Sequence, residues 1–525
     1  KVKNPKLLSA DCQITMDKLH ADVMNANLVA DIANGSLAAA VELDTKDTTR
    51  IPTIEADFDM ATLVADMDTI HADGKNVKGH ASMAASRRNE SIPRFTVKFA
   101  SNALNAAIGQ GLKARTGKIK IEANARYKKD EENVLLKWSP RLKFDLNQGH
   151  VDMATLGTPV EIPQILFSYS NRDFQIDTSR IVIGKSDFSL AGEIKNLGKW
   201  LRKEGDLVGS LRFTSDHTDV NELLAIVNKM NTDSEEPEAQ AQQPKAETAQ
   251  TAQTESEPFM VPQRVDLSLI TRIKSADAFD QNLKNLGGQV IIKDGQVIIE
   301  EMGFICEAAK LQLTAMYKTP RRDHIYVGFD YHMIDIDLQQ LIAMIPQLDT
   351  LVPMLRDFRG GAQFHIAAET YVNSKYEVKY STLRGACSIE GNDLVLLDSK
   401  TFSTISKILM FNKKTENKID SISVQIALYK DQITVYPFCI SIDNYMAAVG
   451  GNHYTDMTFN YHASLLKPLY IGVDVKGNLD DLQIKPAKCR YAKDFRPLFH
   501  RDAEDRSEEL RNIISTSLKK NVKIQ

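Results

Sequence analysis

Apolar and polar residues alternate along most of this 525-residue chain, and this period of two constrains its fold more than any other feature. Val265, Leu267 and Leu269 are separated by Asp266 and Ser268, as in a strand that buries only one of its faces. Similar alternation occurs in both halves of the chain. The pattern favours antiparallel sheet, in which one face is packed and the other is solvated.

A hairpin and a series of further strands are predicted from the same pattern. Asp294-Gly295 lies between two β-branched runs, and this dipeptide favours a tight hairpin because it tolerates positive φ. Further strands are predicted at Ile54–Met60, Phe95–Phe99, Lys118–Tyr127, Arg141–Leu146, Ile165–Ser170, Asp187–Ile194, Val208–Thr214, Leu311–Tyr317, Tyr326–Met333, Gly361–Ala368, Ser421–Leu428 and Gln432–Ile442. The sequence therefore predicts a mainly β fold with a long antiparallel series of strands.

One segment, residues 231–262, lacks this alternation. It has almost no large apolar residue before Phe259 and is rich in Glu, Gln, Thr, Ala and Pro, so it cannot bury enough surface to offset its ordering entropy. We interpret it as a disordered acidic linker. The predicted organisation is a β-rich repeat region over 1–230, the linker over 231–262, a second β region over 263–490 and a tail over 491–525.

Charge and composition exclude two classes of protein. Residues 231–258 carry seven acidic side chains and one lysine, a net −6, so with −4 for the whole chain the rest carries about +2. A nearly neutral body lacks the clustered Lys and Arg on which nucleic-acid binding depends, and nucleic acid is not an expected partner. No window reaches the roughly 20 apolar residues of a membrane-spanning helix.

Four short motifs of similar sequence suggest an internal repeat. Asp-Met-Ala-Thr-Leu occurs at 59–63 and 152–156, and looser versions occur at 219–224 and 335–341. An Asp at the end of a strand can cap a short helix, so these motifs predict repeated strand-plus-helix units, although coincidence is the alternative. Two longer helices are predicted, at Thr401–Asn412 and at Asp502–Lys520, where the second carries Leu510, Ile513, Ile514 and Leu518 on one face.

Catalytic and metal-binding signatures are missing from the sequence. It contains no G-x-S-x-G, H-E-x-x-H or G-x-G-x-x-G motif, each of which needs its spacing to place a nucleophile, ligands or backbone amides. The histidines are dispersed, and the pairs His324 with His332 and His453 with His462 lack ligand spacing. The five cysteines lie far apart, and most are expected to be small buried residues. We expect no enzyme, metal or cofactor; a hydrolase would need converging carboxylates or a Ser/His pair.

The apolar face of a long sheet must be covered by another sheet, by helices or by a ligand. A closed β-sandwich core is the common solution. A curved sheet whose apolar face stays open as a groove for acyl chains is the alternative. Period-two alternation alone does not separate the two.

The order of motifs after the linker resembles the AsmA-like family of envelope proteins, to which TamB and YhdP are related. The resemblance covers about Val265 to Pro486 and includes the hairpin Gly287–Ile299, the Asp-rich segment Met333–Leu341, the segment Leu383–Leu394, Asp431–Pro437 and Met446–Met457. It implies a long antiparallel, curved and repetitive β-sheet with a groove-like form, a few short capping helices and a C-terminal helix. It also marks 263–490 as the AsmA-like region.

The resemblance further implies a function in the envelope of Gram-negative bacteria. Family members are held in the inner membrane by an N-terminal helix, which is absent from this chain, and extend into the periplasm. They support phospholipid transport and outer-membrane assembly by shielding acyl chains, with no catalytic residues. An envelope scaffold that binds a protein partner is the alternative. The groove candidates in this sequence are Val265, Leu267, Leu269, Val327, Phe329, Tyr331, Val424, Ile426, Ile433 and Val435.

Overall fold

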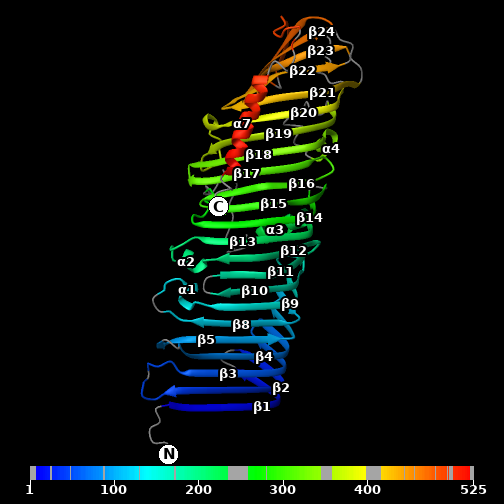
Figure 1. Cartoon of the computed structure of the whole chain (residues 1–525). Coiled ribbons are helices and arrows are strands. Elements are labelled where there is room, and N and C mark those ends of the chain that lie inside the picture. Colours follow the sequence, from blue (N-terminus) through cyan, green and yellow to red (C-terminus); the bar gives the residue numbers. More distant parts are fainter. Residues whose placement is uncertain are drawn as a thin grey trace, which may run out of the picture. The chain divides into compact units, whose positions relative to one another are not determined.

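The computed structural model is mainly β, as predicted, and its strands succeed one another along the chain (Figure 1). It describes residues 7–23, 27–47, 49–86, 89–128, 131–170, 173–233, 258–278, 281–344, 358–397, 416–442, 444–454, 456–478, 481–493, 495 and 501–520. These ranges contain 26 strands, and their pairings are mostly antiparallel. The predicted helix at 401–412 and most of the predicted linker lie outside the described residues.

The chain divides into two compact units, each described here by itself. Unit 1 comprises Lys1–Ala246 and Arg264–Lys274, and unit 2 comprises Glu247–Gln263 and Ser275–Gln525. Unit 2 therefore includes the C-terminal helix, and the first part of the strand after the linker belongs to unit 1.

The elements of unit 1 are β1 (Leu7–Val23), β2 (Leu28–Asp44), β3 (Thr53–Met67), β4 (Ile70–Ser86), β5 (Asn89–Ser101), β6 (Ala103–Ile108), β7 (Leu112–Thr116), β8 (Ile119–Arg126), α1 (Val134–Trp138), β9 (Arg141–Met153), β10 (Val160–Ser170), β11 (Asp173–Ile183), β12 (Ser186–Lys195), α2 (Leu197–Leu201), β13 (Leu207–Asp219), α3 (Val220–Asp233) and most of β14 (Val265–Ala278).

The elements of unit 2 are the end of β14, β15 (Gln281–Lys293), β16 (Gln296–Ile305), β17 (Lys310–Arg321), β18 (His324–Asp337), α4 (Leu338–Met344), β19 (Phe358–Val372), the 3-10 turn η3 (Tyr380–Thr382), β20 (Arg384–Leu397), β21 (Glu416–Tyr429), β22 (Gln432–Ile442), β23 (Tyr445–Tyr454), β24 (Phe459–Lys467), β25 (Ile471–Gly477), β26 (Leu482–Ala487) and α7 (Arg501–Lys520).

Strands β1 to β13 of unit 1 form an up-and-down meander, and most of them are long. β5 and β6 pair end to end with β4 and are interrupted only at Asn102. β7 and β8 pair in the same way with β9 and are interrupted at Gly117 and Lys118. Each of these pairs therefore acts as one long strand that is broken near its middle.

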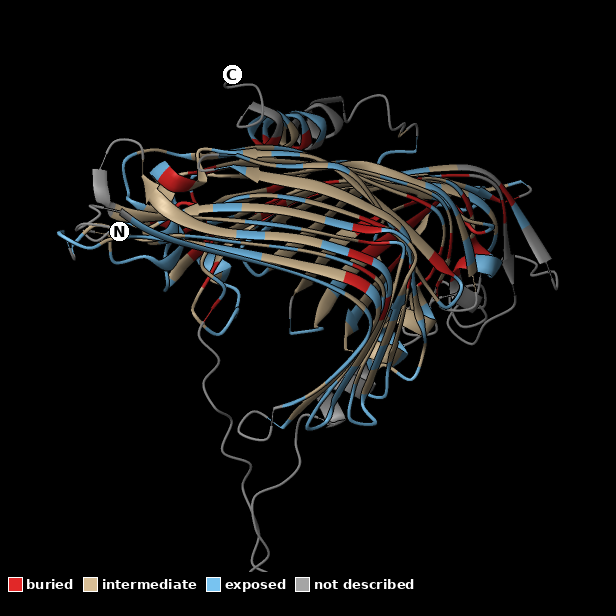
Figure 2. Cartoon of the chain, turned by 90° about the horizontal axis from the view of Figure 1, so that it is seen from below, coloured by how far each residue is buried: buried red, intermediate tan, exposed pale blue. Residues whose placement is uncertain are grey.

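Similar breaks occur in neighbouring strands of unit 1. Asn34 in β2, Asn76 in β4 and Gln148 in β9 have φ of 48°, 51° and 56°, a left-handed conformation that Asn tolerates better than most residues. Figure 2 shows that the strands bend along their length and that buried residues gather near the bends. The local left-handed residues account for these bends.

A left-handed residue also changes which side chains share a face. A β-carbon on Gly74 would lie 2.6 Å from Cγ2 of Val77, and one on Gly35 would lie 3.0 Å from Cγ2 of Ile32. Residues three apart thus lie on one face at a break, whereas residues two apart share a face elsewhere in a strand. The apolar face of unit 1 continues across the breaks although the sequence pattern shifts by one residue.

Gly79 in β4 leaves room for the ring of Phe58 in β3. The two residues are direct cross-strand partners, and a β-carbon on Gly79 would lie only 1.9 Å from Cζ of Phe58. Gly79→Ala is therefore expected to lower the free energy of unfolding by about 1–3 kcal/mol, the usual cost of overpacking. Urea denaturation of the full chain measures this loss.

Gly111→Ala is the matched control, because no atom lies within 4 Å of its ideal β-carbon position. Equal denaturation midpoints for the two variants would show that Phe58 moves aside without cost.

Unit 2 contains the predicted hairpin. β15 and β16 pair up to Lys293 and Gln296, and Asp294 and Gly295 between them have φ of 44° and 77°. Two positive φ values in succession define the turn type that suits the twist of a hairpin. The local sequence therefore determines this turn.

The predicted helix caps are only partly correct. Asp219 accepts a hydrogen bond from the backbone N–H of Glu222 at 2.9 Å, at the start of α3. Asp337 accepts bonds from the N–H groups of Gln339 and Gln340, at the start of α4. The two Asp-Met-Ala-Thr-Leu motifs cap no helix, because 59–63 lies inside β3 and 152–156 spans the end of β9 and a turn. The motif is therefore not a structural repeat.

The C-terminal helix α7 matches its prediction and crosses strands β17 to β21 (Figure 1). Ile514 and Leu518 are fully buried, and they pack with Ile298, Met316 and Ala367. Ile513 is 48% exposed, so its assignment to the packed face was wrong. No helix in the described ranges is long and apolar enough to cross a membrane.

Candidate functional site

The register of unit 1 places a continuous row of apolar residues across nine long strands. Residues directly opposite in an antiparallel pair lie on the same face of the sheet. The central row consists of Ile14, Leu37, Phe58, Gly79, Phe99, Ile121, Phe144, Phe167 and Ile176. Phe144 and Phe167 stack with ring centroids 5.1 Å apart. The row contains no polar side chain.

Rows of small residues lie on either side of this central row. The first alanine row is Cys12, Ala39, Ala56, Ala81, Val97 and Ala123. The second alanine row, beyond the breaks, is Ala21, Ala30, Ala65, Ala72, Ala106 and Ala114. Bulkier apolar residues follow on the outer side of each, such as Ile54 and Ile70. We call the surface made by these three rows the apolar face of unit 1.

The apolar face of unit 1 is accessible to solvent. Ile14 and Val97 keep 46% and 45% of their surface exposed, and the aromatic residues of the central row are half-buried. Trp138 of α1 packs edge-on against Phe95 and Tyr127, with ring centroids 5.5 and 5.1 Å away, at one margin. A half-exposed apolar surface of this extent is unusual for an isolated protein and marks a binding surface.

The opposite face of the same strands is polar. Its middle row is Gln13, Ala38, Asp57, His80, Lys98, Glu122, Lys143, Ser168 and Gln175. Charged neighbours in this row have opposite signs, which stabilises cross-strand pairs. Solvent therefore satisfies one face of unit 1, and the other face requires apolar contacts.

Histidines on this polar face pair with carboxylates across the strands. His71 Nδ1 lies 2.6 Å from Asp66 Oδ1, and His20 Nδ1 lies 2.7 Å from Asp31 Oδ1. The hydrogen bond to Asp66 raises the pKa of His71, and the bond to Asp31 raises that of His20. These exposed pairs tune surface charge and contribute little to stability.

Unit 2 has a corresponding apolar face. Its rows, read from β17 to β22, are Leu313, Tyr331, Ile366, Cys387, Ile426 and Val435, then Ala315, Phe329, Ala368, Gly385, Leu428 and Ile433, and then Leu311, Met333, Phe364, Ile389 and Val424, which ends at β21. One end is covered by α4, whose Leu338 and Leu341 join a buried cluster with Met333 and Ile336. The remaining rows are mostly half-buried.

The ten residues chosen from the sequence fall on these two faces. Val327, Phe329, Tyr331, Val424, Ile426, Ile433 and Val435 all lie on the apolar face of unit 2. Val265, Leu267 and Leu269 alternate along the part of β14 in unit 1, and Val265 is buried. Cδ2 of Leu267 lies 2.8 Å from where a β-carbon on Gly209 would be. Gly209 pairs with Ile194, in the continuation of the first alanine row.

The other face of unit 2 holds a polar cavity beneath α7. Its volume is about 370 Å³, and its lining includes His332, His365, Glu390, Gln425, Glu508 and Arg511. From the sequence, His332 was compared only with His324, and that pair lacks ligand spacing. The direct cross-strand partner of His332 is His365, with ring centroids 4.8 Å apart. Sequence spacing could not reveal this pair, because the chain between the two histidines includes α4 and residues outside the described ranges.

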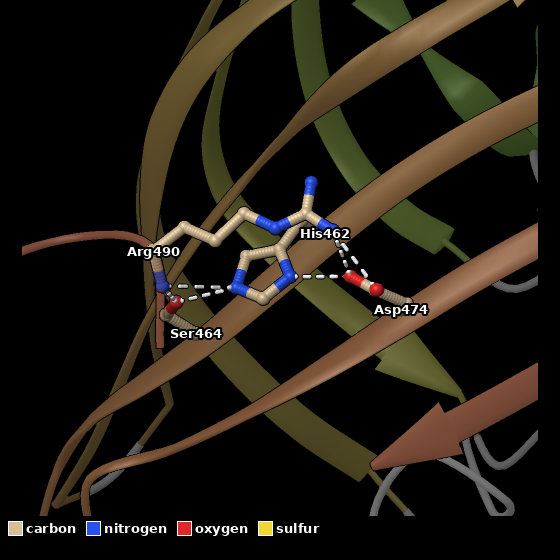
Figure 3. A network of polar contacts seen from close by, with 4 residues as sticks. All are labelled: His462, Ser464, Asp474 and Arg490. Atoms are coloured by element: carbon tan, nitrogen blue, oxygen red, sulfur yellow. Dashed lines mark hydrogen bonds and ion pairs between the residues drawn. The ribbon is translucent and has the colours of Figure 1, made fainter. Parts of the chain in front are cut away.

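A second polar cluster lies between β24, β25 and the segment after β26 (Figure 3). His462 Nδ1 lies 2.6 Å from Asp474 Oδ1, and His462 Nε2 lies 2.8 Å from Ser464 Oγ. The backbone N–H of Arg490 donates to Ser464 Oγ, and its guanidinium donates to both oxygens of Asp474. The bond from His462 and the charge of Arg490 hold the pKa of Asp474 below its usual value.

Hydrogen bonds link Ser464 to His462 and His462 to Asp474. The same chain of side chains activates the nucleophilic Ser in a Ser-His-Asp catalytic triad. Ser464 is fully buried and His462 is 2% exposed, so no substrate reaches the hydroxyl. The Arg490 amide also occupies the side of Ser464 Oγ and His462 Nε2 that a substrate would need. The cluster therefore fastens the segment around Arg490 to the sheet and carries no hydrolytic chemistry in this arrangement.

The five cysteines all lie within the described ranges, form no disulfide bond and are mostly shielded. Cys387 is buried, Cys306, Cys439 and Cys489 are half-buried, and Cys12 is exposed in the first alanine row. Burial raises the pKa of the Cys387 thiol to about 12, which keeps it protonated and unreactive. Within the described ranges, no three His, Cys, Asp or Glu side chains are arranged to hold a metal ion.

Comparisons with known proteins add no family assignment. No protein-family model and no curated protein matches this chain. The function is therefore argued from the geometry of the two apolar faces.

Proposed function

We propose that this chain shields phospholipid acyl chains on its apolar faces and so supports lipid transport and outer-membrane homeostasis. The observation that carries the proposal is the central row of unit 1, which is apolar in nine successive long strands and half-exposed. The similar rows of unit 2 extend the same chemistry. From the resemblance to AsmA-like proteins, we further propose that the chain lies in the periplasm and is anchored in the inner membrane.

The alternation of small and bulky rows suits an extended hydrocarbon. Neighbouring rows on one face of a strand are about 6.8 Å apart, twice the rise per residue. The first alanine row therefore lies between two rows of larger side chains, such as Phe58 and Ile54 on either side of Ala56. We expect an acyl chain to lie along this row, perpendicular to the strands.

The mechanism is passive. Each Å² of apolar surface removed from water contributes about 25 cal/mol. Because the row is apolar in each successive strand, a hydrocarbon that moves along it exchanges one apolar contact for another. We therefore expect movement along the row to encounter no high barrier, and no cofactor or catalytic residue is needed.

Mass spectrometry of lipids extracted from the gently purified full chain tests the proposal. We expect phospholipid in stoichiometric amount, with an unrelated periplasmic protein treated identically as the control. The alkylation rate of Cys12, which lies exposed in the first alanine row, should rise after detergent removes the lipid. A folded protein without lipid, with the same Cys12 rate before and after, would favour a scaffold that binds a protein partner.

A further inference from the structure

Helix α7 is attached to unit 2 in two different ways. In its C-terminal half, the fully buried Ile514 and Leu518 pack on the apolar side chains of Ile298, Met316 and Ala367. Its preceding part, which includes Glu508 and Arg511, lies over the polar cavity of about 370 Å³. The packing of this part thus combines polar groups around the cavity with the apolar contact of Leu510.

The charges around the cavity come from each element packed there. Arg511 is 8% exposed, and one guanidinium N–H donates to Oε1 of Gln425 at 3.0 Å. Glu508 lies one turn earlier on α7, Glu390 lies on β20, and Asp330 lies on β18 behind His365. Charged groups of both signs therefore surround the imidazoles of His332 and His365.

The two imidazoles lie in one cross-strand row beneath α7. The rings of His332 and His365 stack with centroids 4.8 Å apart and an interplanar angle of 27°. His365 Nε2 lies 2.7 Å from Asp330 Oδ1. On the other side, the direct partner of His332 in β17 is the neutral Gln312. Protonation of His332 would place a positive charge beside the His365 ring and near Arg511.

We propose that α7 is a pH-dependent cover, docked on unit 2 at neutral pH and released at mildly acidic pH when His332, which stacks on His365 beneath the helix, becomes protonated. Release would free the apolar side chains Leu510, Ile514 and Leu518 and uncover the apolar patch on β16 to β19. α7 lies on the face opposite the apolar rows, so its release does not depend on acyl-chain binding.

The direction of the effect follows from the docked environment. Burial lowers the pKa of His332, and the neighbouring His365 and Arg511 lower it further, whereas Asp330 and Glu390 oppose them. The docked state therefore binds this proton less well than the released state, in which a histidine titrates near 6.5. Docking is at full strength above that pH and weakens as the pH falls through it towards the lowered pKa.

Hydrogen exchange of the full chain, read by mass spectrometry at pH 7.5 and 5.5, tests the proposal. After correction for intrinsic exchange, we expect protection of α7 amides to fall at least fivefold at pH 5.5, while β18 to β20 keep theirs. His332→Gln with His365→Gln should abolish this fall. His71→Gln in unit 1, where the histidine pairs with Asp66 on an exposed face, should not change it.

Two results would overturn the proposal: equal protection of α7 at both pH values, or an unchanged fall in the double variant. If the double variant does not fold, an NMR titration of the wild-type protein tests the proposal instead. A pKa of His332 at or above 6.5 would contradict it. Ile514→Ser removes a fully buried contact of α7 and should release the helix at pH 7.5. Its hydrogen exchange serves as the reference for the released helix.

Discussion

Val97→Asp is expected to reduce the phospholipid that co-purifies with the chain by at least about tenfold, equivalent to ~1.4 kcal/mol. Val97 lies in the first alanine row and is 45% exposed, so a carboxylate there stays solvated in the empty protein. A hydrocarbon bound along the row would remove that solvation without offering a hydrogen bond. Quantitative lipid mass spectrometry, with a thermal melt to verify folding, measures the loss.

Thr96→Asp is the matched control, because Thr96 is the adjacent residue of β5 and lies on the polar face, where its hydroxyl donates to Asn124. This variant should keep its lipid. Phe329→Asp makes the same test on the apolar face of unit 2. If Val97→Asp and Thr96→Asp retain equal amounts of phospholipid, acyl chains do not bind along this row.

Asp474→Ala is expected to lower the free energy of unfolding of unit 2 by about 2–3 kcal/mol. The carboxylate bonds both the buried His462 ring and the Arg490 guanidinium, and its removal leaves a buried donor unsatisfied. Asp456→Ala, which removes an exposed carboxylate that bonds the nearby Thr458, should cost well under half as much. Denaturant unfolding of the full chain compares the two.

The carboxylate of Asp474 also makes the stability of unit 2 depend on pH in the acidic range. The pKa of Asp474 is lowered in the folded state, first by the bond from His462. Its contribution to stability is therefore complete above the ordinary Asp value of about 3.9 and is lost as the pH falls through the lowered pKa. Asp474→Asn should remove this part of the acid sensitivity, and an identical pH profile in both proteins would refute the assignment.

Local sequence signals predicted much of the fold. The hairpin at Asp294-Gly295, the strands with β-branched alternation and the amphipathic α7 all follow from residues that are close together in the chain. β1, β2 and β4 were not predicted. β2 and β4 are rich in Ala, Asp, Asn and Gly, and β1 contains several Asp and Ala residues; all of these have low strand propensity. Their pairing with neighbours in the meander outweighs that propensity.

The faces of the sheet could not be predicted from alternation alone. At Asn34, Asn76 and Gln148 a left-handed residue shifts the alternation by one position. A strict period of two therefore assigns the residues beyond each break to the wrong face of the sheet. The ten groove candidates lie on β14, β18, β21 and β22, and their common faces emerge only from the register. His462 and Asp474 are direct partners in the β24–β25 hairpin. This hairpin was not predicted from the sequence; had it been, the register would have placed the two side chains together.

The breaks at a common level in unit 1 make its hairpins interchangeable in length and cross-section. β3 and β4 occupy the same rows as β5 with β6 and as β7 with β8, so one hairpin is a module of the sheet. Gain or loss of one such module in evolution would change the span of the apolar rows by about 9.6 Å, two strand spacings, and leave their chemistry intact. The number of hairpins in the sheet thus determines the length of the apolar rows, and the chemistry of the surface is independent of that number.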